Sequence, residues 1–132
     1  MIDINEYTDY VNSITNANPY PKGGSTGMYI EQIMIKAKNI SPTAFKLFMI
    51  IAADTNDYGQ TNRTRAYLAK AVEIKYNRSR MSRLFSELVE EEFLVLFGKY
   101  ITVNPYLVMP RVKSPKLKAS LQSAWTDLVE LV

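Results

Sequence analysis

The apolar residues of segment 76–90 recur at the spacing of an α-helix. Turned by about 100° per residue, they form one stripe, which contains Met81, Leu84, Phe85, Leu88 and Val89. Asn77 is a favourable N-cap residue, so the helix is predicted to begin near Arg78. One face of this helix is therefore expected to belong to the core.

The opposite face of this predicted helix is polar and basic. The same projection places on it Ser79, Ser82, Arg83 and Ser86, with Arg80 at its edge. Glu87 and Glu90 interrupt the face only near its C-terminal end. An isolated helix is stabilised by acids in its first turn and bases in its last, and here that order is reversed. A phosphate or a base edge would supply the missing anion, and the alternative is an ordinary solvated face.

A second amphipathic helix is predicted just upstream, within residues 63–74. Thr64 is its expected N-cap, and Tyr67, Leu68 and Ala71 are expected to face inward. A short turn then leads into the Arg-rich helix. Two helices that each carry one apolar stripe and are joined by so short a turn must cross at a steep angle, which projects the first turns of the second helix outward. This is the geometry of a helix-turn-helix.

A hairpin is predicted after the second helix. Two β-rich runs occupy residues 90–105 and are separated by Gly98 and Lys99. Glycine in the first central position suits a type II′ turn, whose twist matches that of the strands it joins. Lys99 is expected to stand at the tip of the hairpin.

The first third of the chain is less regular. Residues 1–14 predict a short acidic helix, and residues 16–27 a loop or arm rich in Asn, Pro, Gly and Ser. Lys22 in this arm could reach DNA, although a plain linker is the favoured interpretation. Residues 28–38 are ambiguous between strand and helix, and a strand is favoured somewhere within residues 28–35.

A buried helix is predicted at the centre of the chain. Ser41 followed by Pro42 is a favourable helix start, and residues 43–53 are apolar almost all round. The polar segment 54–62 follows as a loop. Its acidic and amide side chains lack the full spacing of a calcium-binding loop, so turn chemistry explains them better than a cation site does.

The chain ends in a predicted amphipathic helix that begins near Ser114 and Pro115, inside the basic cluster 111–118. Its apolar residues follow one stripe, made of Leu117, Leu121, Trp125, Leu128 and Val132. The stripe must be buried either on its own domain or against a second copy. A homodimer is favoured, because a single helix contacts too few base pairs to select a DNA site, whereas a two-fold dimer contacts two half-sites of the DNA. Its interface would contain Leu117, Leu121, Trp125 and Leu128, with help from the N-terminal segment.

Composition narrows the class of protein. A chain of 132 residues with 47% apolar residues is expected to form one globular domain. The absence of cysteine and histidine removes disulfides, thiolate metal sites and the usual nucleophile and base arrangements. No segment approaches about 18 uninterrupted apolar residues, and no signal peptide is recognisable, so a cytoplasmic protein without a membrane partner is expected. Consecutive acids at 90–92 do not share a helix face, and neither an enzyme nor a cofactor is expected.

The distribution of charge says more than the formal net charge of +3. Segment 63–83 holds Glu73 as its single acid against a run of bases, which are Arg63, Arg65, Lys70, Lys75, Arg78, Arg80 and Arg83. A basic patch on an otherwise balanced protein is the electrostatic footprint expected for a nucleic-acid partner.

Helix, turn, helix and hairpin in this order resemble the winged helix-turn-helix family over roughly residues 41–104. The resemblance rests on the segments 68–74 and 77–94 and on the Gly-Lys hairpin. Glu92 departs from the pattern, since many members have Gly between the helix and the first wing strand. More narrowly, segments 41–47 and 100–108 are similar to small replication and copy-control proteins of bacterial plasmids and phages, a fold that also serves transcriptional regulators and partition adaptors.

The resemblance implies a mainly α fold with a small β-hairpin wing and extra N- and C-terminal helices. Residues 1–27 would form an N-terminal helix and flexible loop, 28–110 the winged domain, in which a strand commonly pairs with the wing, and 111–132 the C-terminal helix. The second helix of the pair would enter the major groove of double-stranded DNA. The implied base-reading residues are Ser79, Arg80, Ser82 and Arg83. The resemblance also implies that Lys99 contacts phosphate. As a hypothesis on the same basic segment, the further phosphate-binding residues are Arg63, Thr64, Arg65, Lys75, Asn77 and Arg78.

Two functions follow as hypotheses. The first is a sequence-specific DNA-binding protein of a plasmid or phage, acting as a transcriptional regulator or as a replication or copy-control factor. A replication or transcription protein is a further candidate partner. The second is a winged-helix adaptor between proteins in replication, partition or conjugation, with weak or nonspecific DNA binding.

Overall fold

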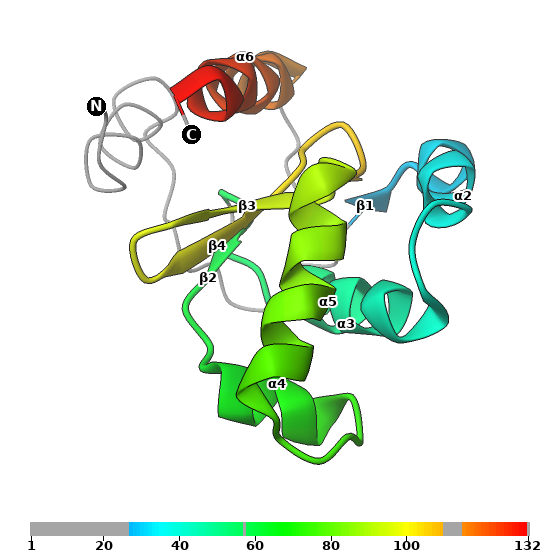
Figure 1. The fold of residues 1–132 in the computed structure, drawn as a ribbon. Coiled ribbons are helices and arrows are strands. Elements are labelled where there is room, and N and C mark those ends of the chain that lie inside the picture. Colours follow the sequence, from blue (N-terminus) through cyan, green and yellow to red (C-terminus); the bar gives the residue numbers. More distant parts are fainter. Residues whose placement is uncertain (1–26, 57, 110–114, 132) are drawn as a thin grey trace.

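Helices dominate the structure, and a small antiparallel sheet lies between them (Figure 1). The computed structural model describes residues 27–56, 58–109 and 115–131. The helices in this part of the chain are α2 (Ile30–Ala37), α3 (Pro42–Ala53), α4 (Arg65–Ala71), α5 (Arg78–Glu90) and α6 (Pro115–Leu131). The strands are β1 (Gly27–Met28), β2 (Gln60–Thr61), β3 (Leu94–Phe97), β4 (Tyr100–Val103) and β5 (Val108–Met109).

The larger of two buried apolar clusters is called the main core, and helix α3 lies at its centre, as predicted. The Ser41 hydroxyl accepts a hydrogen bond from the Ala44 N–H at 3.2 Å, and Pro42 occupies the first turn. The fully buried residues of α3 are Ala44, Leu47, Phe48, Ile51 and Ala52. Phe48 packs edge to face on Phe93, with 4.8 Å between ring centroids. The apolar stripe of α5 covers the same core.

Helix α4 begins at its predicted cap but buries a different arc. The Thr64 hydroxyl accepts from the Tyr67 N–H at 3.1 Å, which confirms the N-cap. The prediction that Tyr67 and Ala71 face inward with Leu68 is wrong, because both are exposed. The buried arc runs through Leu68, Ala69 and Val72. This arc is rotated by about one residue from the expected stripe. Tyr67 lies at the surface, where the Arg63 guanidinium covers its ring.

The sheet joins the predicted hairpin to a strand that the sequence did not indicate. Strands β3 and β4 pair antiparallel with Phe97 opposite Tyr100, and β2 adds to the free edge of β4. Gly98 has a φ of 62°, while Lys99 is not among the residues with positive φ, which fits the predicted type II′ turn. Strand β2 comes from segment 54–62, which was predicted to be a loop.

The prediction of a strand within residues 28–35 is largely wrong, because most of this segment is helical. Only Met28 belongs to a strand, and β1 pairs with β5 instead of the hairpin. Tyr29 is the N-cap of helix α2, and residues 30–35 belong to this helix, whose Ile33 is buried in the main core. A short apolar run leaves this choice to tertiary packing.

Helices α4 and α5 both end in a Schellman motif that has glutamate in the left-handed position. Glu73 and Glu92 have φ values of 65° and 57°. At the end of α5 the Glu92 N–H donates to the Val89 carbonyl at 3.0 Å and the Phe93 N–H to the Leu88 carbonyl at 2.8 Å. The backbone at Glu92 therefore has the conformation that glycine favours at this position.

The second strand of the hairpin is tied to the end of α5 through Asn104. The buried Asn104 amide donates to the Glu92 carbonyl at 2.7 Å, and its side-chain oxygen accepts from the Tyr106 N–H at 2.9 Å. The Asn104 backbone N–H donates to the Phe93 carbonyl at 2.9 Å. These bonds fix the direction in which the hairpin leaves the helix.

Helix α6 covers the face of the sheet that points away from α3 and α5 (Figure 1). Neighbouring residues of a strand point to opposite faces, so Leu94 joins the main core while Val95 and Phe97 join a second cluster. The α6 residues in this cluster are Leu121, Ala124, Trp125 and Leu128.

The assignment of Leu121, Trp125 and Leu128 to a dimer interface is therefore not what the structure shows, because their own chain buries them. The side chains of Leu117 and Val132 lie outside the described residues, as do the predicted helix 1–14, the arm with Lys22 and the start of the basic cluster 111–118. Each of the described helices is too short or too polar to cross a bilayer.

Replacing Glu92 by Gly is expected to stabilise the protein by about 1 kcal/mol. A left-handed residue with a Cβ atom costs roughly 1–2 kcal/mol, of which about 0.4–1 kcal/mol is offset by the greater freedom of glycine in the unfolded chain. Urea unfolding measures the difference. The control is Glu90→Gly, the same substitution at the last residue of α5, where the backbone is helical, which is expected to lose up to about 1 kcal/mol. Equal losses in both variants would contradict the strain at Glu92.

Truncating Trp125 to Ala is expected to lower the free energy of unfolding by roughly 3–5 kcal/mol, because the ring is only 4% exposed within a single chain. The loss should be the same at low and high protein concentration. Asp127→Ala, on the exposed side of α6, should change the value by less than about 0.5 kcal/mol. A urea midpoint that rises with protein concentration would instead place the ring between two chains.

Candidate functional site

Helix α5 presents a polar, basic face to solvent at its N-terminal half. Asn77 caps it, accepting from the Arg80 N–H at 3.0 Å, so the helix begins at Arg78 as predicted. The residues predicted to read bases are all exposed, namely Ser79, Arg80, Ser82 and Arg83. On the other side the predicted stripe is buried except for Val89, which is 37% exposed. The core thus fixes which side of α5 faces outward.

Glu87 does not belong to this outward face, although the sequence placed it there. Its carboxylate accepts hydrogen bonds from the Ser41 N–H at 2.8 Å and from the Ser41 hydroxyl at 3.0 Å. It therefore supplies negative charge to the first turn of α3, where a helix favours it. Ser41 is 46 positions away in sequence, so no local pattern could have indicated the pair. Glu90 is left as the acid on the outward face.

Two predicted phosphate-binding residues act as helix caps. The Thr64 hydroxyl oxygen accepts from the Tyr67 N–H, and the Asn77 side-chain oxygen accepts from the Arg80 N–H. A cap uses an acceptor, so the hydroxyl hydrogen of Thr64 and the amide hydrogens of Asn77 remain donors. Both residues are exposed, and donors are what a phosphate oxygen requires.

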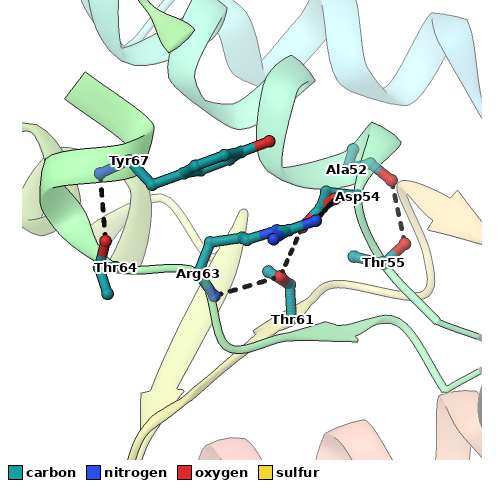
Figure 2. Close-up of polar contacts among 7 residues, drawn as sticks. All are labelled: Ala52, Asp54, Thr55, Thr61, Arg63, Thr64 and Tyr67. Atoms are coloured by element: carbon teal, nitrogen blue, oxygen red, sulfur yellow. Dashed lines mark hydrogen bonds and ion pairs between the residues drawn. The ribbon is translucent and has the colours of Figure 1, made fainter. Parts of the chain in front are cut away.

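Arg63 is held by its neighbours at the connection between β2 and α4 (Figure 2). Its Nε and Nη2 atoms donate to the two oxygens of Asp54 at 2.8 and 3.3 Å. The Thr61 hydroxyl donates to the same carboxylate at 2.9 Å, and the guanidinium carbon lies 4.7 Å from the centre of the Tyr67 ring. The hydrogen bond and charge of Asp54 raise the pKa of Arg63 above its usual value. Its charge is thus balanced within the chain.

Arg65 reaches from α4 across to α5. Its Nη1 atom donates to the Ser82 hydroxyl at 3.0 Å, and its guanidinium carbon lies 4.9 Å from the centre of the Phe85 ring. Arg65 was predicted to bind phosphate and Ser82 to read a base. The structure brings the two together, a contact that depends on the crossing of the helices and not on spacing in the sequence.

The other predicted phosphate-binding residues are exposed cations around α5. Lys75 and Arg78 lie at the turn and at the first position of the helix. Lys99 stands at the hairpin tip, with its Nζ atom 5.8 Å from the centre of the Tyr100 ring. Among the described residues, the side chains of Lys75 and Arg78 take part in no hydrogen bond or ion pair. These charges are free to meet an anion.

A groove runs between α5 and the hairpin. It consists of two adjoining hollows of about 300 and 360 Å³ that share Arg65, Phe85 and Leu96. The first continues along Thr64 to Lys99 at the tip, and the second along Ser82 and Ser86 of α5, with the remaining lining residues Asn62, Arg63, Val89, Glu90, Gly98, Tyr100 and Ile101. Phe85 and Leu96 give the groove apolar surface in both hollows, Lys99 lies at one end, and Glu90 lines the other hollow.

Among the described residues there is no group of three or more His, Cys, Asp or Glu side chains that could hold a metal ion. Asp54, which could have been part of a cation site, is bound to Arg63 and Thr61, and Asp57 lies outside the described residues.

Comparison with known proteins gives no relative. No family model matches the chain, and no curated protein or solved structure matches it at a significant level. A functional assignment has to rest on the geometry and charge of the site itself.

Removing the Glu87 carboxylate is expected to destabilise the protein without changing the outward face of α5. Hydrogen bonds to a charged group contribute about 1.5–3 kcal/mol, so Glu87→Ala should lower the free energy of unfolding by about 2 kcal/mol. Glu90→Ala, one turn away without such a partner, should change it by less than about 0.5 kcal/mol. Urea unfolding compares the two. Equal effects would mean that the Ser41 contact contributes nothing.

Proposed function

We propose that this chain is a sequence-specific double-stranded DNA-binding protein of the winged helix-turn-helix type. In this proposal it serves a plasmid or phage as a transcriptional regulator or as a replication or copy-control factor. The observation that carries the proposal is the exposed first half of α5, where Arg80 and Arg83 stand beside serine hydroxyls on a helix whose opposite face is fixed in the core. Lys99 at the hairpin tip lines one hollow together with Thr64 and Arg65 at the start of α4 and Phe85 of α5.

The dimensions and chemistry of the site support the proposal. An α-helix with its side chains is about 10–12 Å across, and the major groove is about 12 Å wide. Arginine pairs in a bidentate way with guanine O6 and N7, which is the role proposed for Arg80 and Arg83. Ser79 would adjust the fit at its own position. Lys75, Arg78 and Lys99 would hold phosphates and set the register without reading sequence.

Recognition by α5 alone would cover few base pairs, so two copies on neighbouring half-sites about one helical turn apart are part of the proposal. The buried residues of α6 cannot form their interface without leaving their own chain. The contact between copies would involve other surfaces.

A second candidate is an adaptor that binds another protein, and helix α2 favours it. Ile30, Met34 and Ile35 are 55%, 63% and 55% exposed, and these side chains have no role in the DNA-binding proposal. Clustered exposed apolar residues mark interaction surfaces in many proteins. The two candidates differ in salt dependence, because binding to several phosphates weakens steeply as salt rises.

Selection of bound fragments from a random duplex library tests the leading proposal. A motif with two half-sites about one turn apart is the expected result. Binding that is absent even at low salt, with no enriched motif, would reject it and leave the adaptor.

Two substitutions separate base reading from phosphate binding. Arg83→Ala is expected to lower affinity for the selected site by roughly 1–3 kcal/mol and to relax preference at one base pair. Lys99→Ala should weaken binding to selected and random duplexes alike, with a shallower dependence on salt. Fluorescence titrations against both duplexes provide the measurement.

Lys38→Ala serves as the control, because this exposed lysine is the C-cap residue of α2. Helix α2 and the hairpin lie on opposite sides of α5 in Figure 1. Its affinities should match those of the unaltered protein. If Arg83→Ala weakened both duplexes equally, the base-reading role of Arg83 would be rejected.

A further inference from the structure

The contact between Arg65 and Ser82 determines whether the Ser82 hydroxyl can act as a donor or as an acceptor toward a further partner. The guanidinium group carries only donors, so the Ser82 oxygen must be the acceptor in the 3.0 Å bond. The one hydrogen of the hydroxyl is then left to point elsewhere. Within the described part of the chain this hydroxyl has no second partner, and Ser82 is exposed on the outward face of α5.

Arg65 is held in this position by two contacts and not by one. Besides the bond to Ser82, its guanidinium lies over the Phe85 ring, which is only 2% exposed and belongs to the main core. Cations over aromatic faces are attracted by the ring quadrupole. The ring therefore fixes the guanidinium, and the guanidinium in turn fixes the hydroxyl one turn earlier on α5.

We propose that Arg65 is a positioning residue that makes Ser82 a hydrogen-bond donor toward a base edge in the major groove. The proposal rests on the proposed function and names the chemistry that Ser82 would read. A donor is complementary to an acceptor, which purine N7, guanine O6 and thymine O4 provide. It is not complementary to the cytosine amino group. The nearby positive charge strengthens the hydroxyl as a donor and weakens it as an acceptor.

This role differs from the phosphate contact that the sequence suggested for Arg65. A phosphate contact replaces a condensed counterion, so each one contributes about 0.9 to the slope of log affinity against log salt. A bond from Arg65 to Ser82 within the protein contributes no such release. The salt slope and the base preference therefore distinguish the two roles.

The test uses the full chain and the duplex motif that it selects, with the variants Arg65→Met, Ser82→Ala and the double variant. Methionine keeps an unbranched side chain over Phe85 but removes the donors. Each single variant is expected to reduce discrimination at the same base pair by roughly three- to tenfold, the size of one hydrogen bond. The double variant should reduce it no further, because the two residues act as one unit.

Salt titrations complete the test. Arg65→Met should leave the salt slope unchanged, whereas the control Arg78→Met, at an exposed cation on α5, should make it shallower by about 0.9. Arg65→Lys, which retains one charged donor, should recover part of the lost discrimination. Urea unfolding of every variant confirms that the compared proteins are folded.

The failures are distinguishable. If Arg65→Met lowered the salt slope by about 0.9 and left base preference intact, Arg65 would bind phosphate directly and the positioning role would be overturned. Losses of discrimination at different base pairs, or losses that add in the double variant, would overturn it as well. If the unaltered chain selected no motif, the proposed function would fail and the positioning role with it.

Discussion

The orientation of α5 is the constraint on which the rest of the structure depends. Its apolar stripe packs on α3, and the Glu87 carboxylate joins it to the first turn of α3 through Ser41. A helix held only by apolar contacts can rotate or slide slightly, because such contacts are not directional. Two hydrogen bonds to one carboxylate are directional. They fix both the rotation of α5 and its height along α3, and so fix where its outward face points.

The helix starts and the hairpin turn could be predicted from the sequence, because they depend on interactions between neighbouring residues. Ser41, Thr64 and Asn77 cap the three central helices where their short polar side chains predicted it. Gly98 defines the hairpin turn through a backbone conformation that favours glycine. In each case the signal and its partner lie within a few residues of each other. The exposed and buried faces of α5 were predicted from helical periodicity except at Glu87, which binds Ser41, and at Val89, which is exposed.

Features that depend on contacts between residues far apart in the sequence could not be predicted. Residues 28–35 became mainly helix because Ile33 reaches the main core, and strand β2 exists because β4 offers it a free edge. The pairing of Arg65 with Ser82 depends on how two helices cross. The α6 stripe was recognised as apolar, but its pattern is the same whether the covering surface belongs to its own chain or to another. Periodicity identifies a face that must be buried and does not identify what buries it.

The packing of α6 behind the sheet has a consequence for the hairpin. A two-stranded hairpin alone is marginally stable in water, and its tip would be ordered only on contact with a partner. Here Val95 and Phe97 are packed against α6, so the hairpin is ordered beforehand. Each side chain immobilised on binding costs about 0.5–1.5 kcal/mol, and preorganisation avoids part of that loss. A change that weakened the packing of α6 on the sheet would thus weaken the binding contacts of Lys99, although α6 takes no part in those contacts.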